Sequence, residues 1–153
     1  MANTFSQIYV QVVFAVKGRE NLMSKLWKDE LYKYITGICK NNQQKLIAIN
    51  GVADHIHILI GLKPSMALAN LVQDIKSNSS KFINEKKFVK GKFSWQEGYG
   101  AFSCAHSQLD VVIKYIENQE NHHAIKSFKE EYLLFLKSYH IEYDEKYLFE
   151  WIE

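Results

Sequence analysis

The sequence predicts a single α+β domain in which strands pair in an antiparallel hairpin and amphipathic helices alternate with them. First, 153 residues with 47% hydrophobic and 24% charged side chains are typical of one globular domain with its own core. Second, runs of β-branched and aromatic residues alternate with segments whose apolar residues recur every three or four positions. Third, only a turn separates two of the predicted strands, which favours an antiparallel pair. We therefore expect one domain over residues 1–153.

The chain begins with a predicted central strand and a helix. Residues 8–16 are β-branched and aromatic up to the turn at Gly18, where Lys17 and Arg19 present two cations. A helix is predicted from Met23 to about Asn41, with Ser24 as its cap. Its apolar stripe consists of Leu22, Leu26, Leu31, Tyr34, Ile35 and Ile38.

The predicted hairpin places two histidines side by side. It consists of a strand over 45–49, a tight-turn signal at Asn50-Gly51 and a strand over 55–60. Because strand side chains alternate, His55 and His57 share one face, from which both rings can converge on one cation. A solvated polar face would carry the same two residues. The opposite, core-facing side carries Ile56, Ile58 and Ile60.

A second helix, predicted to start at a Ser65 cap, leads into a lysine-rich segment. Between Lys76 and Lys92 there are six lysines and one acid. Lysines and hydroxyls suit contacts to phosphates and sugars, so four residues are candidate DNA contacts, with a solvated helix face as the alternative: Lys76, Ser79, Ser80 and Lys81. Lys17 and Arg19 are further candidates. The helix has an apolar stripe of Leu68, Leu71, Val72, Ile75, Phe82 and Ile83.

Charge is distributed unevenly along the chain. The formal charge is +7 over residues 1–116 and −5 over residues 117–153, although the total is only +2. A basic body with an acidic tail suits a polyanion that binds one surface, while ordinary scatter of charge is the alternative.

A glycine-rich aromatic loop precedes the last predicted strand, residues 101–104. Gly98 and Gly100 bracket Tyr99, which we expect to be available for stacking on an unpaired base. Trp95 and Phe102 are expected to pack in the core.

A helix predicted over about 107–123, with Ser107 as its cap, carries the candidate nucleophile. Tyr115 lies outside the apolar stripe and lines up with Gln119 and His122. A phenol with an ordinary pKa near 10 needs an activated electrophile, which a divalent cation on a phosphate supplies. Two imidazoles and an amide oxygen, without a thiolate, favour Mg²⁺ or Mn²⁺ over a structural zinc site. The stripe itself is Leu109, Val112, Ile113 and Ile116.

Two motifs resemble those of a known family. His55-Ile56-His57 resembles the His-hydrophobic-His motif of HUH nucleases, and the segment from Tyr115 to Gln119 resembles the Tyr-x-x-x-Gln motif of the single-tyrosine, IS200-like transposases. The resemblance runs from Tyr9 to Tyr147. It implies a ferredoxin-like, RRM-like fold and a DNA transposase that cuts and rejoins single-stranded DNA. In that activity Tyr115 forms a 5′-phosphotyrosine and frees a 3′-hydroxyl, while His55, His57 and Gln119 hold the metal.

The resemblance also implies the partners of this chain. These are single-stranded DNA with hairpin ends and a second copy of the chain, in a homodimer whose composite sites can pair one subunit's tyrosine with the other's histidines. His122 is a further candidate DNA contact. A catalytically idle, domesticated single-stranded-DNA-binding protein is the main alternative. Histidine-triad hydrolases need a histidine where Leu59 stands, and relaxases or replication initiators of the same superfamily are usually longer.

The two ends of the chain complete the prediction. A tail over about 126–153 is predicted to be helical and then aromatic and acidic, serving as packing or dimer contact. The amino terminus lacks a basic region followed by an apolar run, and no apolar stretch is long enough to span a bilayer, so we expect a cytoplasmic, unanchored protein. Cys39 and Cys104 are expected to be free thiols.

Overall fold

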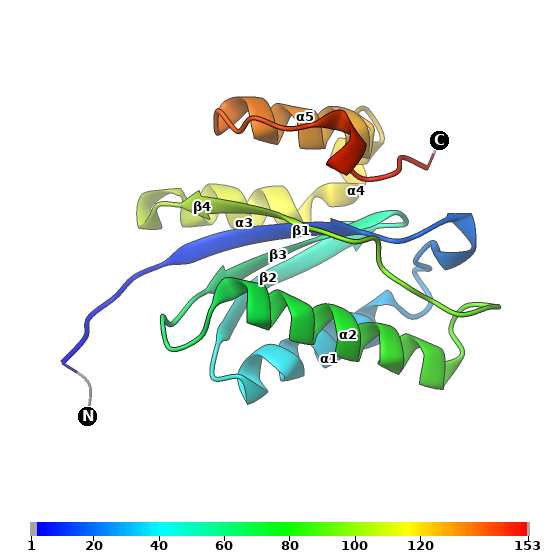
Figure 1. Ribbon diagram of the computed structural model, residues 1–153, viewed down its shortest axis with the longest axis horizontal. Coiled ribbons are helices and arrows are strands. Elements are labelled where there is room, and N and C mark those ends of the chain that lie inside the picture. The colour runs from blue at the N-terminus through cyan, green and yellow to red at the C-terminus, as the bar shows by residue number, and fades with distance from the viewer. Residues whose placement is uncertain (1–2, 153) are drawn as a thin grey trace.

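Four antiparallel strands form the sheet on which the rest of the chain packs (Figure 1). The computed structural model describes residues 3–152. The strands are β1 (Tyr9–Ala15), β2 (Lys45–Val52), β3 (His55–Gly61) and β4 (Gly100–Cys104), in the spatial order β2-β3-β1-β4. The helices are α1 (Lys28–Asn41), α2 (Leu68–Lys86), α3 (Leu109–Glu117), α4 (Gln119–His123) and α5 (Phe128–Ser138). This order of elements is the ferredoxin-like arrangement, so the predicted fold class is confirmed.

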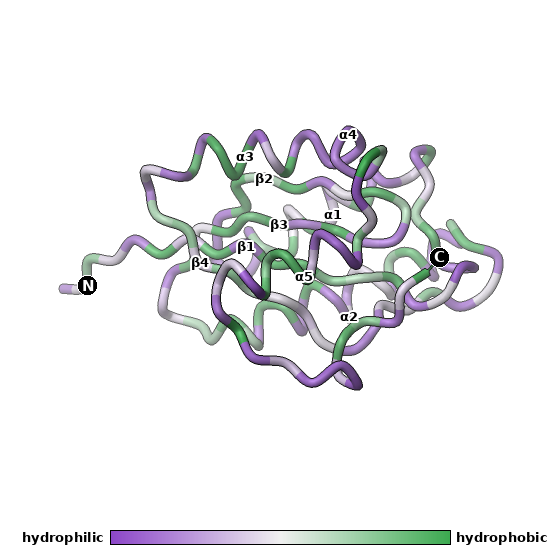
Figure 2. The backbone as a smooth tube through the Cα atoms, turned by 90° about the horizontal axis from the view of Figure 1, so that it is seen from above, coloured by the Kyte–Doolittle hydropathy of each residue, from purple (hydrophilic) through white to green (hydrophobic). Residues whose placement is uncertain are grey.

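Helices cover both faces of the sheet. Helices α1 and α2 lie on one face, and α3, α4 and α5 lie on the other (Figure 1). Seen from above, α3 and α4 follow the β2 side, while α5 lies over β1 and β4 (Figure 2). The three isoleucines of β3 are fully buried on the α1–α2 side, as predicted. His55 and His57 are also fully buried, so the alternative of a solvated histidine face is wrong.

The hairpin turn lies later than predicted. β2 continues through Asn50 and Gly51 to Val52, and the chain turns at Ala53 and Asp54. At Gly51 a side chain would collide with the backbone carbonyl of His55 across the hairpin. This glycine therefore permits close backbone approach at the end of the strands, which explains why it resembled a turn signal.

Two helices start later than the sequence predicts. Leu26 is 95% exposed, because the chain before α1 forms irregular turns in which the backbone carbonyl of Ser24 accepts hydrogen bonds from the amides of Trp27 and Lys28. α1 starts at Lys28 without a side-chain cap, so the predicted cap at Ser24 is wrong. The predicted cap at Ser65 is wrong as well. α2 starts at Leu68, and Ala67 precedes it without a side-chain cap.

The helix predicted over 107–123 is two helices. α3 ends at Glu117, Asn118 leaves helical geometry, and α4 starts at Gln119. Ser107 lies in a 3-10 turn and does not cap α3. The predicted apolar stripe of α3 is confirmed, because its residues pack against Ala48 and Leu59 of the sheet.

The helix at the start of the tail is α5, and the chain after Ser138 is irregular apart from a 3-10 turn at Glu145–Tyr147. The rest of the tail returns to the body. The Gln96 side chain donates to the carbonyl of Glu150 at 2.7 Å and accepts from its amide at 2.6 Å. Phe149 packs on Tyr132 of α5, with ring centroids 5.1 Å apart. These contacts hold α5 over the sheet.

Two aromatic side chains at and after the glycine-rich loop pack in the core, as predicted. Trp95 and Phe102 are buried, whereas Tyr99 is 36% exposed. Within residues 3–152, no helix is both long enough and apolar enough to span a bilayer.

Candidate active site

The two histidines of β3 are held by their Nδ1 atoms. Nδ1 of His55 lies 2.7 Å from a carboxylate oxygen of Asp54, and Nδ1 of His57 lies 3.1 Å from the side-chain carbonyl of Gln11 on β1. Nδ1–H groups that donate to these oxygens direct both Nε2 atoms into the site, where each can donate to a carboxylate when it carries a proton and can bind a metal when it does not. The ring centroids are 5.1 Å apart. Each ring is therefore oriented as in a metal-binding histidine.

Both Nε2 atoms meet a carboxylate from the tail. Oε1 of Glu131, on α5, lies 3.2 Å from Nε2 of His55 and 3.0 Å from Nε2 of His57. Nε2 of His123, at the end of α4, is 3.2 Å from the same oxygen. The ligand atoms of these four residues all lie within 4.8 Å of one another. Such a cluster suits a cation, since lone pairs from three rings and an anionic oxygen otherwise face one another.

Electrostatics couple the members of this cluster. Burial lowers the pKa of His57 to about 4, and Glu131 offsets this only in part. Burial also lowers the pKa of His55, but hydrogen bonds to Asp54 and Glu131 outweigh that effect and raise it. Burial alone would raise the pKa of Glu131, but the hydrogen bonds from His123, His55 and His57 hold it below its usual range. Glu131 is therefore an anion that compensates buried imidazoles.

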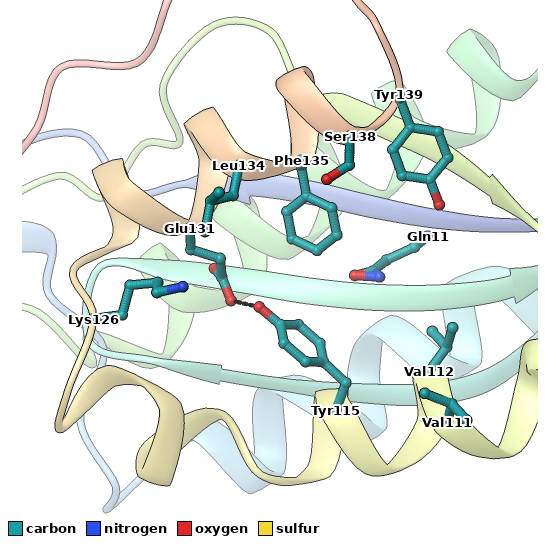
Figure 3. A pocket seen from close by; sticks show the side chains of 10 residues that line it. All are labelled: Gln11, Val111, Val112, Tyr115, Lys126, Glu131, Leu134, Phe135, Ser138 and Tyr139. Carbon is teal, nitrogen blue, oxygen red and sulfur yellow. Dashed lines mark hydrogen bonds between the residues drawn. The ribbon is translucent and has the colours of Figure 1, made fainter.

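Tyr115 points its hydroxyl at the other oxygen of the same carboxylate. The phenol donates a hydrogen bond to Oε2 of Glu131 (Figure 3). The Tyr115 ring stacks on His122, with centroids 4.4 Å apart, and lies edge-on to His57 at 5.9 Å. Burial, and next the hydrogen bond to Glu131, raise the pKa of Tyr115. The phenol is therefore protonated at neutral pH and must lose its proton when it reacts.

Gln119 lies beside the cluster. It is fully buried, and its side-chain carbonyl lies 3.2 Å from Nε2 of His123. Its amide nitrogen donates to the backbone carbonyl of Tyr115 at 3.3 Å. The predicted ligand thus contacts a histidine that itself contacts Glu131.

One strand residue ties the tyrosine helix to the histidine strand. Asn50 pairs with His57 in the sheet, and its side-chain amide donates to the carbonyls of Ile116 and Glu117, both at 3.0 Å. These carbonyls lie at the end of α3, where a helix leaves its acceptors without partners. The predicted sharing of sites between two subunits stays a prediction.

Two of the predicted DNA contacts lie beside this cluster. His122 shares a hollow with His123 and Glu131, and Arg19 shares another with Asp54 and His123. None of the other predicted contacts lines these two hollows. Lys76, Ser80 and Tyr99 surround one hollow of about 430 Å³ between α2 and the aromatic loop. α2 lies on the sheet face opposite to α3, the helix that contains Tyr115 (Figure 1). Lys81 is exposed on α2. Nζ of Lys76 donates to the carbonyls of Gln96 and Gly98, at 2.6 and 2.8 Å, so it supports the loop.

The structure contradicts the prediction that Ser79 contacts DNA. Its side chain is fully buried, and its hydroxyl accepts a hydrogen bond from the Trp95 indole at 3.0 Å. A hydroxyl sealed beneath an indole cannot contact DNA, so this assignment is wrong. Lys17 and Arg19 are exposed after β1, and Arg19 lines a second hollow that also contains Asp54 and His123.

Sequence reasoning missed four residues of the site: Gln11, Asp54, His123 and Glu131. The adjacency of Asp54 to His55 was a usable signal, because a carboxylate is a frequent partner of a metal-binding imidazole. His123 follows His122 directly, and nothing in the sequence indicates which of the two faces the cluster. Gln11 and Glu131 are 46 and 74 positions from His57, and only the fold brings them to it.

Comparisons with known proteins agree on one family. Residues 4–119 match the family described as transposase, IS200-like. The ISDra2 transposase TnpA of Deinococcus radiodurans is 22% identical over 120 residues, which cover 75% of this chain and 86% of that protein.

Two solved structures share the fold. A crystal structure of a proposed transposase from Deinococcus radiodurans R1 has a TM-score of 0.63 at 21% identity and covers 78% of this chain and 95% of its own. A REP-associated tyrosine transposase bound to a REP hairpin has a TM-score of 0.60 at 11% identity, over 80% of this chain and 73% of its own. His123 and Glu131 lie beyond the residues that match the family.

Proposed function

Because this chain belongs to the IS200-like transposase family, we propose that it cuts and rejoins single-stranded DNA through a covalent bond to Tyr115. One observation carries the proposal. The Tyr115 hydroxyl and the Nε2 atoms of His55 and His57 converge on the two oxygens of Glu131. The candidate nucleophile and the candidate metal centre thus contact one carboxylate, so a cation at the cluster could activate a phosphate that lies beside the phenol.

The proposed cleavage step moves one proton and exchanges one bond at phosphorus. The Tyr115 oxygen attacks the scissile phosphate, and its proton passes along the hydrogen bond to Oε2 of Glu131 and on to water, because the low pKa of this carboxylate does not let it keep the proton. The new phosphotyrosine bond forms as the bond to the 3′-oxygen breaks, and the departing oxygen takes a proton from water. The products are a 5′-phosphotyrosine and a free 3′-hydroxyl. Attack by a 3′-hydroxyl on the phosphotyrosine reverses the step and rejoins DNA.

A divalent cation fits the residues of the cluster. His55, His57, His123 and Glu131 would hold it, and Gln119, the predicted amide ligand, lies beside them. When bound, the cation would neutralise and polarise the non-bridging oxygens of the scissile phosphate. We predicted Mg²⁺ or Mn²⁺. The additional imidazole favours Mn²⁺ over Mg²⁺, because Mg²⁺ prefers oxygen ligands and keeps its waters.

We propose single-stranded DNA with hairpin ends as the substrate. The support is a relative of similar fold that binds a REP hairpin, together with the exposed lysines on and after α2. A homodimer and a cytoplasmic location remain predictions of the family resemblance and of the sequence. Within one chain, Tyr115 contacts the same carboxylate as His55 and His57.

The test is covalent capture of DNA. Purified protein is incubated with Mg²⁺ or Mn²⁺ and single strands taken from the DNA that flanks its gene, then examined by denaturing electrophoresis and intact mass. We expect a protein–DNA adduct that Tyr115→Phe reduces by at least about a thousandfold, with DNA affinity nearly unchanged. Tyr143→Phe is the matched control, since this tyrosine lies in the tail and is 49% exposed.

Either of two results would contradict the proposal. Adduct formation by Tyr115→Phe at the rate of the unmodified protein would exclude Tyr115 as the nucleophile. Tight binding of the strands without any adduct, across both metals, would favour the single-stranded-DNA-binding alternative.

A further inference from the structure

A cavity opens beside the candidate nucleophile. It has a volume of about 340 Å³, at the small end of the range for ligand pockets, and lies between α3 and α5 above β1 (Figure 3). Its walls are mostly apolar or aromatic, with polar groups at the floor and the two ends. The lining includes Val111, Tyr115, Leu134, Phe135, Ser138 and Tyr139.

The geometry points to a binding site for one unpaired nucleobase of the strand being cut, at the nucleotide next to the scissile phosphate. This inference rests on the proposed function. Tyr115 and Glu131 belong both to the candidate active site and to the cavity wall. A phosphate placed at the Tyr115 hydroxyl therefore holds a neighbouring nucleotide at the mouth of the cavity. An apolar, aromatic pocket of this size suits a flat base taken out of its stack.

The polar groups of the cavity fit a nucleotide. The carbonyl of Gln11 contacts Nδ1 of His57, so its NH₂ group is the part offered at the cavity floor to acceptor atoms of a base. At the end of the cavity away from Lys126, Ser138 supplies a hydroxyl. Lys126 stands beside Glu131 and Tyr115, and within residues 3–152 it forms no ion pair within 4.0 Å. Its ammonium is therefore available to the phosphate of the bound nucleotide.

The aromatic side chains form a fixed platform. Phe135 stacks on Phe102 of β4, with centroids 4.9 Å apart, and meets the Tyr115 ring edge-on at 5.9 Å. The Tyr139 hydroxyl donates to the carbonyl of Ser103 at 2.8 Å. Because both rings are anchored to β4, a base stacking on them loses little free energy to ordering the protein.

The test combines two changes: one base is removed from the DNA, and the cavity is filled by a substitution in the protein. Binding is measured in the Tyr115→Phe background, which keeps the strand intact, by fluorescence anisotropy of strands from the flanking DNA with one abasic site moved along them. We expect one position, next to the cleavage site, where loss of the base weakens binding by about 5-fold to 150-fold. Ser138→Leu fills the cavity, so it should weaken binding of the intact strand and remove this abasic penalty.

Ser107→Leu is the matched control, because Ser107 is exposed and does not line the cavity. Val111→Leu fills the cavity from the opposite wall, at a side chain that is 64% exposed. It replaces Ser138→Leu if the midpoint of thermal unfolding of that variant is much lower than that of the unmodified protein. An abasic penalty that is unchanged in the filled variants, or no position with a penalty, would overturn the base site. The readout needs no cleavage, so adduct formation by the unmodified protein separately decides the proposed function.

Discussion

The two faces of the sheet are built for different purposes. The face under α1 and α2 is covered mainly by aliphatic and aromatic side chains, with the buried Ser79 hydroxyl hydrogen-bonded to Trp95, and Lys81 is exposed on α2. The face under α3, α4 and α5 buries histidines, a glutamate and a glutamine beside Tyr115. One face stabilises the domain by excluding water. The other places charged groups where low polarity strengthens their interactions, which is the environment that catalysis uses.

The comparison separates chemistry from affinity. Changes at the histidine–glutamate cluster and at Tyr115 should alter metal binding and cleavage, and changes in the cavity beside them should alter binding of one base. Changes among the lysines of the opposite face should alter only the overall DNA affinity and its dependence on salt. A result that crosses these two classes would break the division.

The largest effect is expected from Glu131→Gln. An amide retains the size of the side chain but cannot take the Tyr115 proton, so the rate of adduct formation should fall by about a hundredfold to ten-thousandfold. Single-turnover kinetics with excess protein measure this rate. Glu130→Gln is the control, because Glu130 is exposed on the same helix. Equal rates in the two variants would show that Glu131 serves only packing.

His57→Ala should come next. It removes a buried nitrogen that contacts Glu131 at 3.0 Å, and the affinity for Mn²⁺ should fall by about a hundredfold or more. Isothermal titration calorimetry measures the affinity, and His106→Ala, at an exposed position, serves as the control. An unchanged titration would mean that the metal does not bind at the histidines.

Asn50→Ala tests how the tyrosine helix is held. The change removes the donor to two partly exposed carbonyls at the end of α3, so the free energy of unfolding should fall by about 0.5–1.5 kcal/mol. Urea unfolding measures this loss. In Asn78→Ala the removed side chain bonds only to a backbone carbonyl of its own helix, so its effect should be smaller. If the two variants lose equal stability, Asn50 is not a special anchor.

The smallest effect is expected from Lys81→Ala on the opposite face. Loss of one phosphate contact should reduce the log–log slope of DNA affinity against salt by roughly 0.7 to 0.9, without changing the rate of adduct formation in the bound complex. Lys40→Ala, at an exposed site on α1 outside the lysine-rich segment, should leave the slope unchanged. The same slope in both variants would place the DNA elsewhere.

Local sequence patterns were enough to predict several features of the fold and of the candidate site. Strand alternation put His55 and His57 on one face, and helical spacing identified the stripe by which α3 packs on the sheet. These features depend on backbone geometry over a few residues, so they can be predicted without knowledge of the partners. Glycine at position 51 was misread, because a turn and a close backbone approach favour the same residue.

Only the tertiary structure shows which groups contact the faces of these strands and helices. Glu131 reaches the histidines because the tail folds back through Gln96 and holds α5 over the sheet. Ser79 looked like a surface hydroxyl until Trp95 was placed over it. A side chain's direction follows from its own strand or helix, but the group that faces it comes from distant segments, whose packing is fixed by the burial of the whole core.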